Sequence, residues 1–324
     1  MKYIYGPVPS RRLGFSLGVD LVPYKTCSFD CIYCQLGKTT ERTIARKEYF
    51  KKEEVLQDIR NALSIDKQID YITFSGSGEP TLNSGIGWLI RKVKNIRTLR
   101  SVSLPLAVLT NSSFLWDKSL REDLLPADLV VPSLDAATQS VFEAINRPHQ
   151  SLNIDKIVEG IKKFRQEFKN NLWLEIMLVK GVNDSKDEIK GFKNLISEIH
   201  PDKVHLNTVV RPPTEKFARP LSIKELDEIR DFFGESCEVI TPKVGRCEPS
   251  LAPSFDRSKF DKSNSEDIEH TIIELIRRRP VTLSDIHSSL GIHRNELIKY
   301  LEVLEGDKKI KKIDYEEVTY YEYK

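Results

Sequence analysis

Three thiols fall within eight residues of this 324-residue chain, in the stretch Cys27-Ser28-Phe29-Asp30-Cys31-Ile32-Tyr33-Cys34. This spacing lets one loop surround a single metal centre, and thiolates are the ligands of iron–sulfur clusters. A [4Fe–4S] cluster normally takes four protein ligands, so three cysteines would leave one iron open to another ligand. A structural zinc loop would need a fourth ligand, and Cys237 and Cys247 are far away in the sequence. The spacing favours iron–sulfur over zinc without deciding between them, because thiolates bind both metals.

The cysteines follow the first of six short apolar runs that alternate with amphipathic stretches of helical period. This alternation indicates βα units around a parallel sheet. The expected strands are residues 16–22, 71–75, 106–110, 129–134, 173–179 and 204–210. The expected helices are residues 53–63, 86–96, 139–145, 154–168, 186–199 and 222–233. Six units predict an α/β fold of the partial (β/α)6 TIM-type barrel kind, with its chemistry at the C-terminal ends of the strands.

The pattern changes after residue 264. Three expected helices, residues 268–278, 283–290 and 294–305, precede two short strands at 308–313 and 318–323, with Gly291 between the second and third helices. This order is typical of a winged helix-turn-helix. We therefore expect a barrel over residues 1–220, its C-terminal extension and a linker over 221–264, and a small winged-helix domain over 265–324.

The winged-helix interpretation suggests nucleic-acid binding, but the charge of this region is unfavourable. Residues 265–324 carry thirteen acidic and ten basic side chains, where a DNA-binding domain normally has a basic patch. The local candidates for nucleic-acid contacts lie on the third helix and at the wing: His293, Arg294, Asn295, Lys299, Lys308, Lys309, Lys311 and Lys312.

Composition points to a cytoplasmic protein. The chain is 40% hydrophobic and 30% charged with a formal charge of +2, so no overall field attracts nucleic acid or anionic lipid. Five cysteines are an odd number for a disulfide framework, which favours a reducing compartment. We expect no secretory signal and no contact with a membrane, because no apolar run approaches the ~20 residues that span a bilayer.

A second motif ends the second expected strand, in the run Gly76-Ser77-Gly78-Glu79-Pro80. Glycines at a strand end allow the backbone to approach a ligand closely, and the carbonyls and Glu79 offer acceptors for an ammonium group. A plain turn would explain one glycine but not the whole run. Asn111, Ser133 and Asp135 follow the next two strands; each is equally expected as a helix N-cap, and Asp135 is the clearest such case.

Together these motifs resemble the radical S-adenosylmethionine (SAM) superfamily. The C-x3-C-x2-C spacing with an aromatic residue before the last cysteine is similar to its signature, and Gly-Ser-Gly-Glu-Pro is similar to its Gly-Gly-Glu-Pro element. The resemblance implies that Cys27, Cys31 and Cys34 bind three irons of a [4Fe–4S] cluster and that SAM chelates the fourth. It implies cofactor contacts for Tyr33, Gly76, Ser77, Gly78, Glu79, Asn111, Ser133 and Asp135.

The implied activity is that of an oxidoreductase. Reductive cleavage of SAM would give methionine and a 5′-deoxyadenosyl radical that abstracts hydrogen from a substrate, while the protein positions and shields the reaction. A ferredoxin or flavodoxin is the expected electron donor. A cluster-bearing transcriptional sensor that binds DNA through the winged helix is the alternative. A sensor has no use for the Gly-Ser-Gly-Glu-Pro run, so the enzyme is favoured.

The N-terminal stretch Tyr5-Gly6-Pro7-Val8-Pro9-Ser10-Arg11-Arg12-Leu13-Gly14 narrows the resemblance. With the cysteine loop it resembles a prokaryotic group related to the wyosine tRNA synthetases, over residues 3–219. Those enzymes carry a second cysteine-bound cluster and a Schiff-base lysine. Cys237 and Cys247 cannot form a second three-cysteine site, so the substrate stays open, with tRNA or another macromolecule held by the winged helix as one candidate.

Residues that act on the substrate are harder to identify. Arg11, Arg12, Arg147 and Arg211 are candidates for a basic rim that binds RNA phosphate, and pairing with carboxylates is an equally good interpretation. Cys247, beside Arg246, is a weak candidate for an active-site thiol. Cys237 is expected to be a small buried residue. We also expect SAM cleavage to persist in a chain truncated after residue 264; the oligomeric state stays open.

Overall fold

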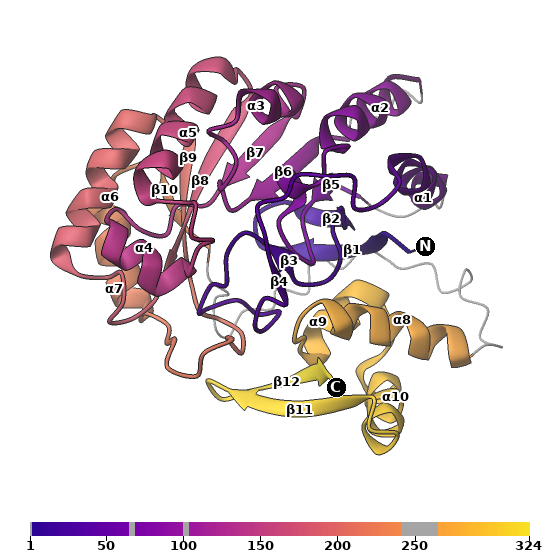
Figure 1. The fold of residues 1–324 in the computed structure, drawn as a ribbon. Helices are drawn as coiled ribbons and strands as arrows, with labels where there is room; N and C mark the ends of the chain where they lie inside the picture. The colour runs from indigo at the N-terminus through magenta and orange to yellow at the C-terminus, as the bar shows by residue number, and fades with distance from the viewer. Residues whose placement is uncertain (1, 65–68, 100–103, 241–264) are drawn as a thin grey trace.

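The protein is described by a computed structural model that covers residues 2–64, 69–99, 104–240 and 265–324. Cys247 and the expected boundary near residue 264 lie outside these ranges. The structure contains one large sheet with surrounding helices and a smaller C-terminal unit, defined here as residues 265–324 (Figure 1). In the ranges covered, no helix is both long and apolar enough to cross a membrane.

Eight strands form the large sheet, in the order β1-β2-β5-β6-β7-β8-β9-β10. β1 runs antiparallel to β2, and the other neighbouring pairs are parallel. The strands are β1 Ile4–Ser10, β2 Gly14–Val19, β5 Tyr71–Phe74, β6 Leu106–Thr110, β7 Leu129–Pro132, β8 Asn171–Leu178, β9 Lys203–Thr208 and β10 Cys237–Val239. The predicted α/β fold with a mostly parallel sheet is confirmed.

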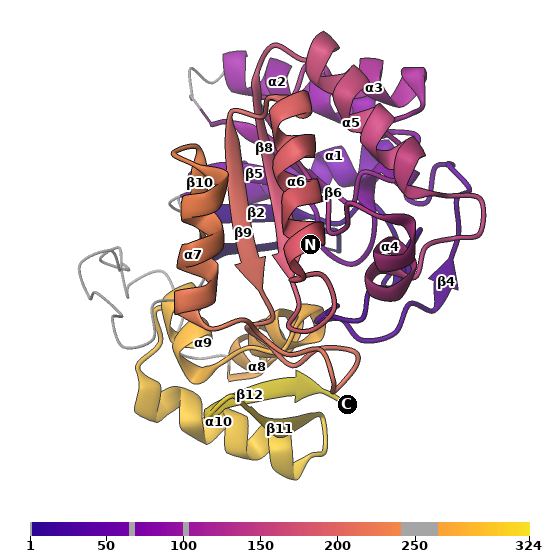
Figure 2. The ribbon, with the colours of Figure 1, turned by 90° about the vertical axis from the view of Figure 1, so that its left-hand side faces the viewer.

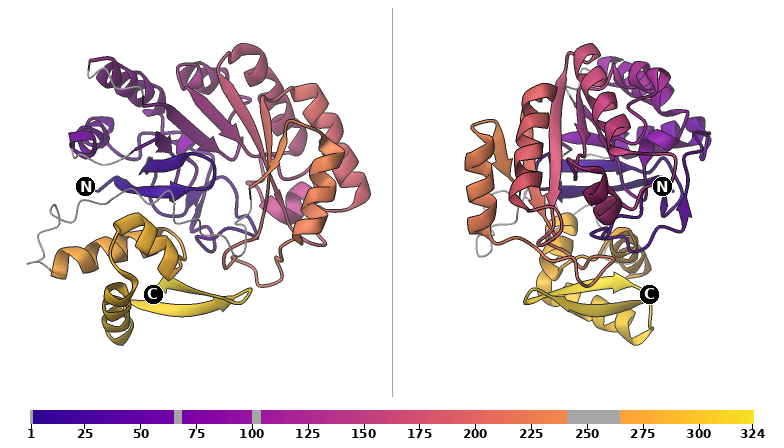
Figure 3. Two further views of the ribbon diagram at one scale, coloured as in Figure 1. Left: turned by 180° about the vertical axis from the view of Figure 1, so that it is seen from behind. Right: turned by 60° about the vertical axis from the view of Figure 1, so that its left-hand side comes forward.

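Two further strands and seven helices complete this part. The pair β3 Thr26–Cys27 and β4 Glu41–Arg42 lies in the cysteine loop. The helices are α1 Lys52–Ser64, α2 Ile86–Leu99, α3 Lys118–Leu124, α4 Gln139–Asn146, α5 Ile154–Glu167, α6 Lys186–Ile199 and α7 Ile223–Phe233, with the short 3-10 helix Pro80–Leu82 after β5. Figure 3 shows the larger helices arranged around the outer side of the sheet.

The sequence prediction missed β1. This stretch contains Pro7 and Pro9, and proline cannot donate to a sheet ladder, so the run does not resemble a strand. β1 forms nevertheless because it is the edge strand of the sheet, where one row of backbone donors needs no partner. The antiparallel hairpin with β2 brings Arg11 and Arg12, which follow β1, to the sheet.

The two faces of the sheet differ because side chains alternate along a strand. Leu174 and Leu206 are fully buried in the main core that the sheet forms with its helices. Their neighbours Glu175 and Asn207 line a cavity on the other face, as does Thr73 of β5. The inner face of the sheet therefore carries polar groups, and it positions the site described below.

The C-terminal unit consists of α8 Ser265–Arg278, α9 Leu283–Leu290, α10 Arg294–Gly306, β11 Ile310–Tyr315 and β12 Val318–Tyr323. Its element order is the one that the sequence predicts, and Gly291 ends α9 in the left-handed conformation. The unit has its own apolar cluster, against which Val8 of β1 packs. Tyr320 Oη also donates to the carbonyl of Val210, at 2.8 Å. Figure 2 shows β9 pointing toward this unit.

Candidate active site

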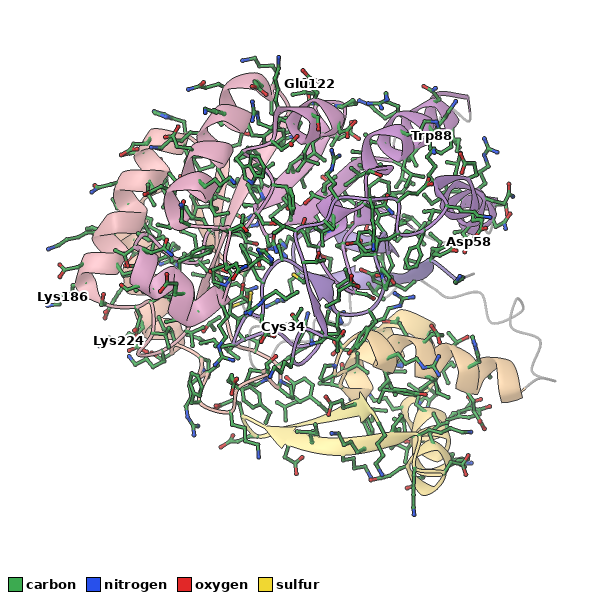
Figure 4. The ribbon with its side chains drawn as sticks, viewed as in Figure 1. Cys34, Asp58, Trp88, Glu122, Lys186 and Lys224 are labelled. Atoms are coloured by element: carbon green, nitrogen blue, oxygen red, sulfur yellow. The ribbon has the colours of Figure 1, made fainter. Side chains whose placement is uncertain are left out.

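One cavity of about 400 Å³ collects most of the predicted site residues. Its wall includes the three clustered cysteines, Tyr33 and the glycine-rich run after β5. The inner face of the sheet and helices α8 and α9 complete it. Figure 4 places Cys34 among the loops between the sheet and the C-terminal unit. Residues from both ends of the chain therefore meet in this cavity.

The cysteine loop is fixed by backbone hydrogen bonds to distant elements. The N–H groups of Asp30 and Ile32 donate to the carbonyls of Asn146 and Ile145 at the end of α4, each at 3.0 Å. Thr214 Oγ1 donates to the carbonyl of Cys34, at 2.8 Å. The Ile32 side chain is fully buried in the core. These contacts with distant parts of the chain therefore hold the cysteine loop in place.

Side-chain amides donate to two of the sulfurs. Asn111 Nδ2 lies 3.5 Å from Cys27 Sγ, and Asn146 Nδ2 lies 3.4 Å from Cys31 Sγ. Burial raises the pKa of the Cys27 thiol to about 12, and it also raises the pKa values of Cys31 and Cys34. Amide donors stabilise sulfur that carries negative charge. The three thiols are therefore placed for binding a metal centre.

Lys25 adds a positive charge beside these thiols. Its backbone has the left-handed φ of 65°, and its buried Nζ has no hydrogen-bond partner in the described part of the chain. Burial lowers the pKa of Lys25, and negative charge on Cys34, Asp30, Cys27 and Cys31 would raise it. A buried ammonium without a hydrogen-bond partner costs free energy unless negative charge compensates it. The Asp30 carboxylate supplies part of that charge, and three thiolates around an iron–sulfur cluster would add to it, so these residues fit the cluster that the sequence implies.

The described residues do not form a site for a single metal ion. Among residues 2–64, 69–99, 104–240 and 265–324, no group of three or more His, Cys, Asp or Glu side chains is placed to hold one ion. This finding concerns a single ion. The ligands of a four-iron cluster stand farther apart, because the cluster itself lies between them.

The glycine-rich run packs against the cysteine loop. A Cβ atom on Gly78 would lie 1.9 Å from the carbonyl oxygen of Thr26. Lys25 N donates to Ser77 O at 2.6 Å, and Glu79 N donates to Thr26 O at 3.1 Å. Gly76 has a φ of +118°, and its Cβ would lie 2.1 Å from Asp20 Oδ1. The glycines thus permit close contacts within the protein, whereas the sequence suggested close contact with a ligand.

Glu79 is buried and fully engaged with the protein. One carboxylate oxygen accepts from Thr81 Oγ1 at 2.6 Å and Thr110 Oγ1 at 2.7 Å, and the other accepts from Asn111 N at 2.7 Å. Burial raises its pKa, although these hydrogen bonds oppose the shift. The Glu79 carboxylate therefore joins the end of β5 to the end of β6, and its contact with a SAM ammonium group stays a prediction.

Asp135 does not cap a helix, so the N-cap interpretation was wrong. Helix α4 begins four residues later, with Thr138 at the N-cap. The Asp135 carboxylate instead accepts from Tyr33 Oη at 2.5 Å, Asn146 Nδ2 at 2.8 Å and Met177 N at 3.0 Å. Burial raises the pKa of Asp135 to about 6. Asn146 thus connects Asp135 to Cys31, and two of the predicted cofactor contacts, Tyr33 and Asp135, are brought together.

The remaining cofactor candidates lie nearby. Asn111 Nδ2, besides its contact with Cys27, donates to Ser28 Oγ at 2.9 Å. Ser133 forms a bridge with Glu175 at the end of β7, and its carbonyl accepts from Ser112 Oγ at 2.7 Å. These positions follow from strands β6 and β7 ending at the same edge of the sheet. Their contacts with SAM stay predictions.

The structure places the residues predicted to contact the substrate, and the two remaining cysteines, in different surroundings. Arg147 pairs with Glu215 at 2.5 Å, as the carboxylate-pairing interpretation expects. Arg211 lines the cavity and lies 3.4 Å from Asp285 of α9. Cys247 lies outside the described residues. Cys237 is buried in β10, and burial raises its pKa to about 12, as expected for a structural thiol.

Four residues of the site were missed by the sequence analysis. Asn146 donates to Cys31, and Lys25 interacts electrostatically with the clustered cysteines. The only feature of the sequence that could have identified either residue is the closeness of Lys25 to Cys27. Asp20 Oδ1 accepts from Ser77 N at 2.9 Å and pairs through its other oxygen with Arg278 of α8. No local pattern marks Arg278, because it is distant in sequence from everything it contacts.

Comparisons with known proteins identify the superfamily to which the chain belongs. A family model described as "Radical SAM superfamily" matches residues 21–192 of this chain. A UPF0026 protein of Methanocaldococcus jannaschii is 33% identical over 99% of this chain and 96% of its own length. A protein of Brachyspira hyodysenteriae named GTPase Obg is 37% identical over 96% of this chain, which spans only 43% of that relative's length.

Solved structures give the same fold. Streptococcus suis SuiB bound to S-adenosylmethionine is 15% identical, with a TM-score of 0.53, and the match covers 72% of this chain and 52% of that protein. At this level of identity the likeness supports the fold alone.

Proposed function

Because the chain belongs to the radical SAM superfamily and is thus an enzyme of that superfamily, we propose that it binds a [4Fe–4S] cluster through Cys27, Cys31 and Cys34 and cleaves SAM reductively. When bound, the cluster would supply the electron that breaks a carbon–sulfur bond of SAM and releases the hydrogen-abstracting 5′-deoxyadenosyl radical. The chain's own residues hold, orient and shield the reactants.

The observation that carries this proposal is the surroundings of the three thiols. Asn111 and Asn146 donate to sulfurs, and the buried Lys25 ammonium, which has no hydrogen-bond partner among the described residues, interacts electrostatically with the three cysteines and with Asp30. Hydrogen bonds and positive charge near the sulfurs stabilise the negative charge of thiolate ligands. A buried structural thiol such as Cys237 would not need this arrangement.

SAM would lie against the glycine-rich run in the same cavity. Ser77 and the glycines beside it are held by Asp20 and by the cysteine loop. Tyr33 and Asp135, already hydrogen-bonded to each other, would flank the cofactor. Streptococcus suis SuiB, which has this fold, is known with SAM bound, and this supports SAM as the ligand without fixing its contacts. Helices α8 and α9 line the cavity as well, which would exclude water from the radical.

The finer architecture belongs to the same proposal. The parallel strands β2 and β5 to β9 follow one another in sequence order, which supports a partial (β/α)6 barrel. The left-handed Gly291 between α9 and α10, with the antiparallel β11 and β12 after them, supports a winged helix. A ferredoxin or flavodoxin donor, a relation to the wyosine group and a cytoplasmic location stay parts of this proposal.

The transcriptional sensor is not favoured. Most of the lysines at the proposed wing pair with neighbouring carboxylates: Lys309 with Asp307, Lys311 with Glu322 and Lys312 with Glu305. On the opposite side, the unit faces the cavity of the sheet. The C-terminal unit is therefore better suited to closing the site than to binding DNA.

The test is anaerobic reconstitution of the full chain followed by reduction with dithionite in the presence of SAM. We expect about four irons per chain, as one cubane requires, and formation of 5′-deoxyadenosine and methionine. Cys31→Ala should abolish both, whereas Cys237→Ala should keep both. Reduced wild-type protein that holds its cluster and yields no deoxyadenosine would contradict the proposal.

A further inference from the structure

Five arginines line the same cavity, and the proposed cluster and SAM contacts do not use them: Arg11, Arg12, Arg211, Arg278 and Arg279. The first two follow β1, Arg211 follows β9, Arg278 is the last residue of α8, and Arg279 comes directly after it. A cavity wall with this many guanidinium groups, built from three separate parts of the chain, requires negative charge to balance it.

The carboxylates around these arginines balance only part of the charge. Arg12 pairs with Glu175 at 2.5 Å, and Arg278 pairs with Asp20. Arg211 Nη2 lies 3.4 Å from Asp285 Oδ2. The buried Nε of Arg211 has no hydrogen-bond partner among the residues covered. Among the described residues, three carboxylates therefore pair with five guanidinium groups, an excess of two positive charges.

Among the described residues, Arg11 and Arg279 are the two of these arginines with which no carboxylate pairs directly, although Glu175 attracts Arg11 and Asp285 attracts Arg279 from beyond ion-pair distance. Arg11 Nη1 donates only to neutral oxygens, Asn207 Oδ1 and the carbonyl of Ile240, each at 2.9 Å. For Arg279 the described ranges show no hydrogen bond and no ion pair. Burial lowers the pKa of both Arg11 and Arg279, and the positive charge of nearby Arg211 lowers it further. The pKa of each falls to about 10. Both stay cationic at neutral pH, and they repel Arg211.

We propose that Arg11, Arg211 and Arg279 bind the phosphate monoester of an anionic substrate. The inference rests on the proposed function and names the substrate class of the same cavity. Guanidinium groups bind phosphate oxygens in pairs with well-defined geometry. A phosphate monoester carries about −1.5 to −2 charges at pH 7, which matches this excess of two positive charges. A phosphodiester in RNA carries one charge per phosphate and would leave one arginine unpaired.

The test measures binding to the full-length, cluster-loaded protein without reductant, by isothermal titration calorimetry. The probes are inorganic phosphate, ribose 5-phosphate and ribose. We expect ribose 5-phosphate to bind and ribose not to bind. Arg279→Gln and Arg11→Gln should each raise the dissociation constant of ribose 5-phosphate about tenfold, or about 1.4 kcal/mol. Arg60→Gln, an exposed position on α1, is the matched control and should leave it unchanged.

Further arms of the experiment separate the sources of phosphate. A short RNA with a 5′-phosphate should bind more tightly than the same RNA without it, and Arg279→Gln should remove the difference. Equal binding of the two RNAs, with the same dependence on Arg279, would assign the site to the phosphodiester backbone and overturn the proposal. Competition between SAM and phosphate for the site would assign the arginines to the SAM carboxylate and would also overturn it.

Two other results would be decisive. If ribose binds as well as ribose 5-phosphate, or if Arg60→Gln weakens binding as much as Arg279→Gln, the cavity arginines do not recognise phosphate. Arg279 makes no hydrogen bond or ion pair in the described ranges, so its loss should leave the melting temperature unchanged. None of these measurements uses SAM cleavage, so a failure here is separate from a failure of the proposed function.

Discussion

Gly78 shows how a single residue joins the two sequence motifs of the site. Its Cα lies so close to the backbone of the cysteine loop that a Cβ atom would lie 1.9 Å from Thr26 O. The adjacent hydrogen bond from Glu79 N to the same oxygen fixes this contact. Thr26 precedes Cys27, so the position of the first thiol depends on the absence of a side chain at residue 78.

We therefore expect Gly78→Ala to displace the cysteine loop. The added methyl group meets backbone, which cannot move aside as a flexible side chain would, and overpacking of this kind typically costs about 1–3 kcal/mol. The iron content after reconstitution should fall, and the urea midpoint should fall with it. Gly306→Ala is the control, because nothing lies within 4 Å of its Cβ position. Unchanged iron content in Gly78→Ala would show that the loop tolerates the shift.

Helix α8 is linked to the glycine-rich run, where we propose that SAM binds, through one ion pair. Arg278, its last residue, pairs with Asp20 and lies over the ring of Tyr5, 4.4 Å from the centroid. Asp20 in turn accepts from Ser77 N, and Tyr5 Oη lies 3.0 Å from Ser75 Oγ. The end of α8 thus supports the glycine-rich run through Asp20 and Tyr5.

From this arrangement we expect Arg278→Gln to weaken SAM binding. Loss of the ion pair leaves Asp20 buried without a counter-charge and frees the run that holds Ser77. The dissociation constant of SAM, measured by calorimetry on the reconstituted protein, should rise about tenfold, or about 1.4 kcal/mol. Arg277→Gln changes the neighbouring, half-exposed arginine, which pairs with Glu274, and should change affinity less than about twofold. Equal effects of the two substitutions would rule out a positioning role for Arg278.

At the scale of the whole molecule, the C-terminal unit is part of the cavity. Arg278, Arg279, Val281 and Asp285 line it, and Tyr320 binds the carbonyl after β9. The expectation that SAM cleavage persists after truncation at residue 264 assumed an independent unit. The contacts argue against that assumption, because truncation would uncover Val8 and leave Asp20 without Arg278.

Acid should weaken the docking of the C-terminal unit. Burial alone would raise the pKa of Asp285, but Arg211 and the N–H of Thr282 outweigh it and hold this pKa below its usual value. The stabilisation is therefore present above the unfolded pKa of about 3.9 and is lost as the pH falls through the folded pKa. Below pH 4 the free energy of unfolding should decrease by about 1 kcal/mol more in the wild type than in Asp285→Asn.

Urea unfolding at several pH values measures this difference. Asp187→Asn serves as the control, because this carboxylate is 98% exposed and should give the wild-type pH dependence. If Asp285→Asn and the wild type lose stability in parallel below pH 4, the Arg211–Asp285 pair does not contribute to docking.

The sequence by itself determined the fold class and the cysteine loop, because both depend on short-range patterns. Alternating apolar runs and amphipathic helices specify βα units, and three cysteines within eight residues must share one loop. For the same reason the strands and helices predicted after β2 largely match the observed ranges, whereas β3, β4, α3 and β10 were not predicted. β1 was missed because its prolines contradict a local strand pattern, and only its position at the edge of the sheet allows it.

Only the tertiary structure decided which side chains complete the site. Asp135 resembles a helix cap in sequence, but folding turns it toward Tyr33 and Asn146. Arg279 lies more than 260 residues from Arg11, yet both line one cavity. Contacts between residues far apart in the chain depend on how the elements pack, and no local pattern of charge or hydrophobicity encodes them.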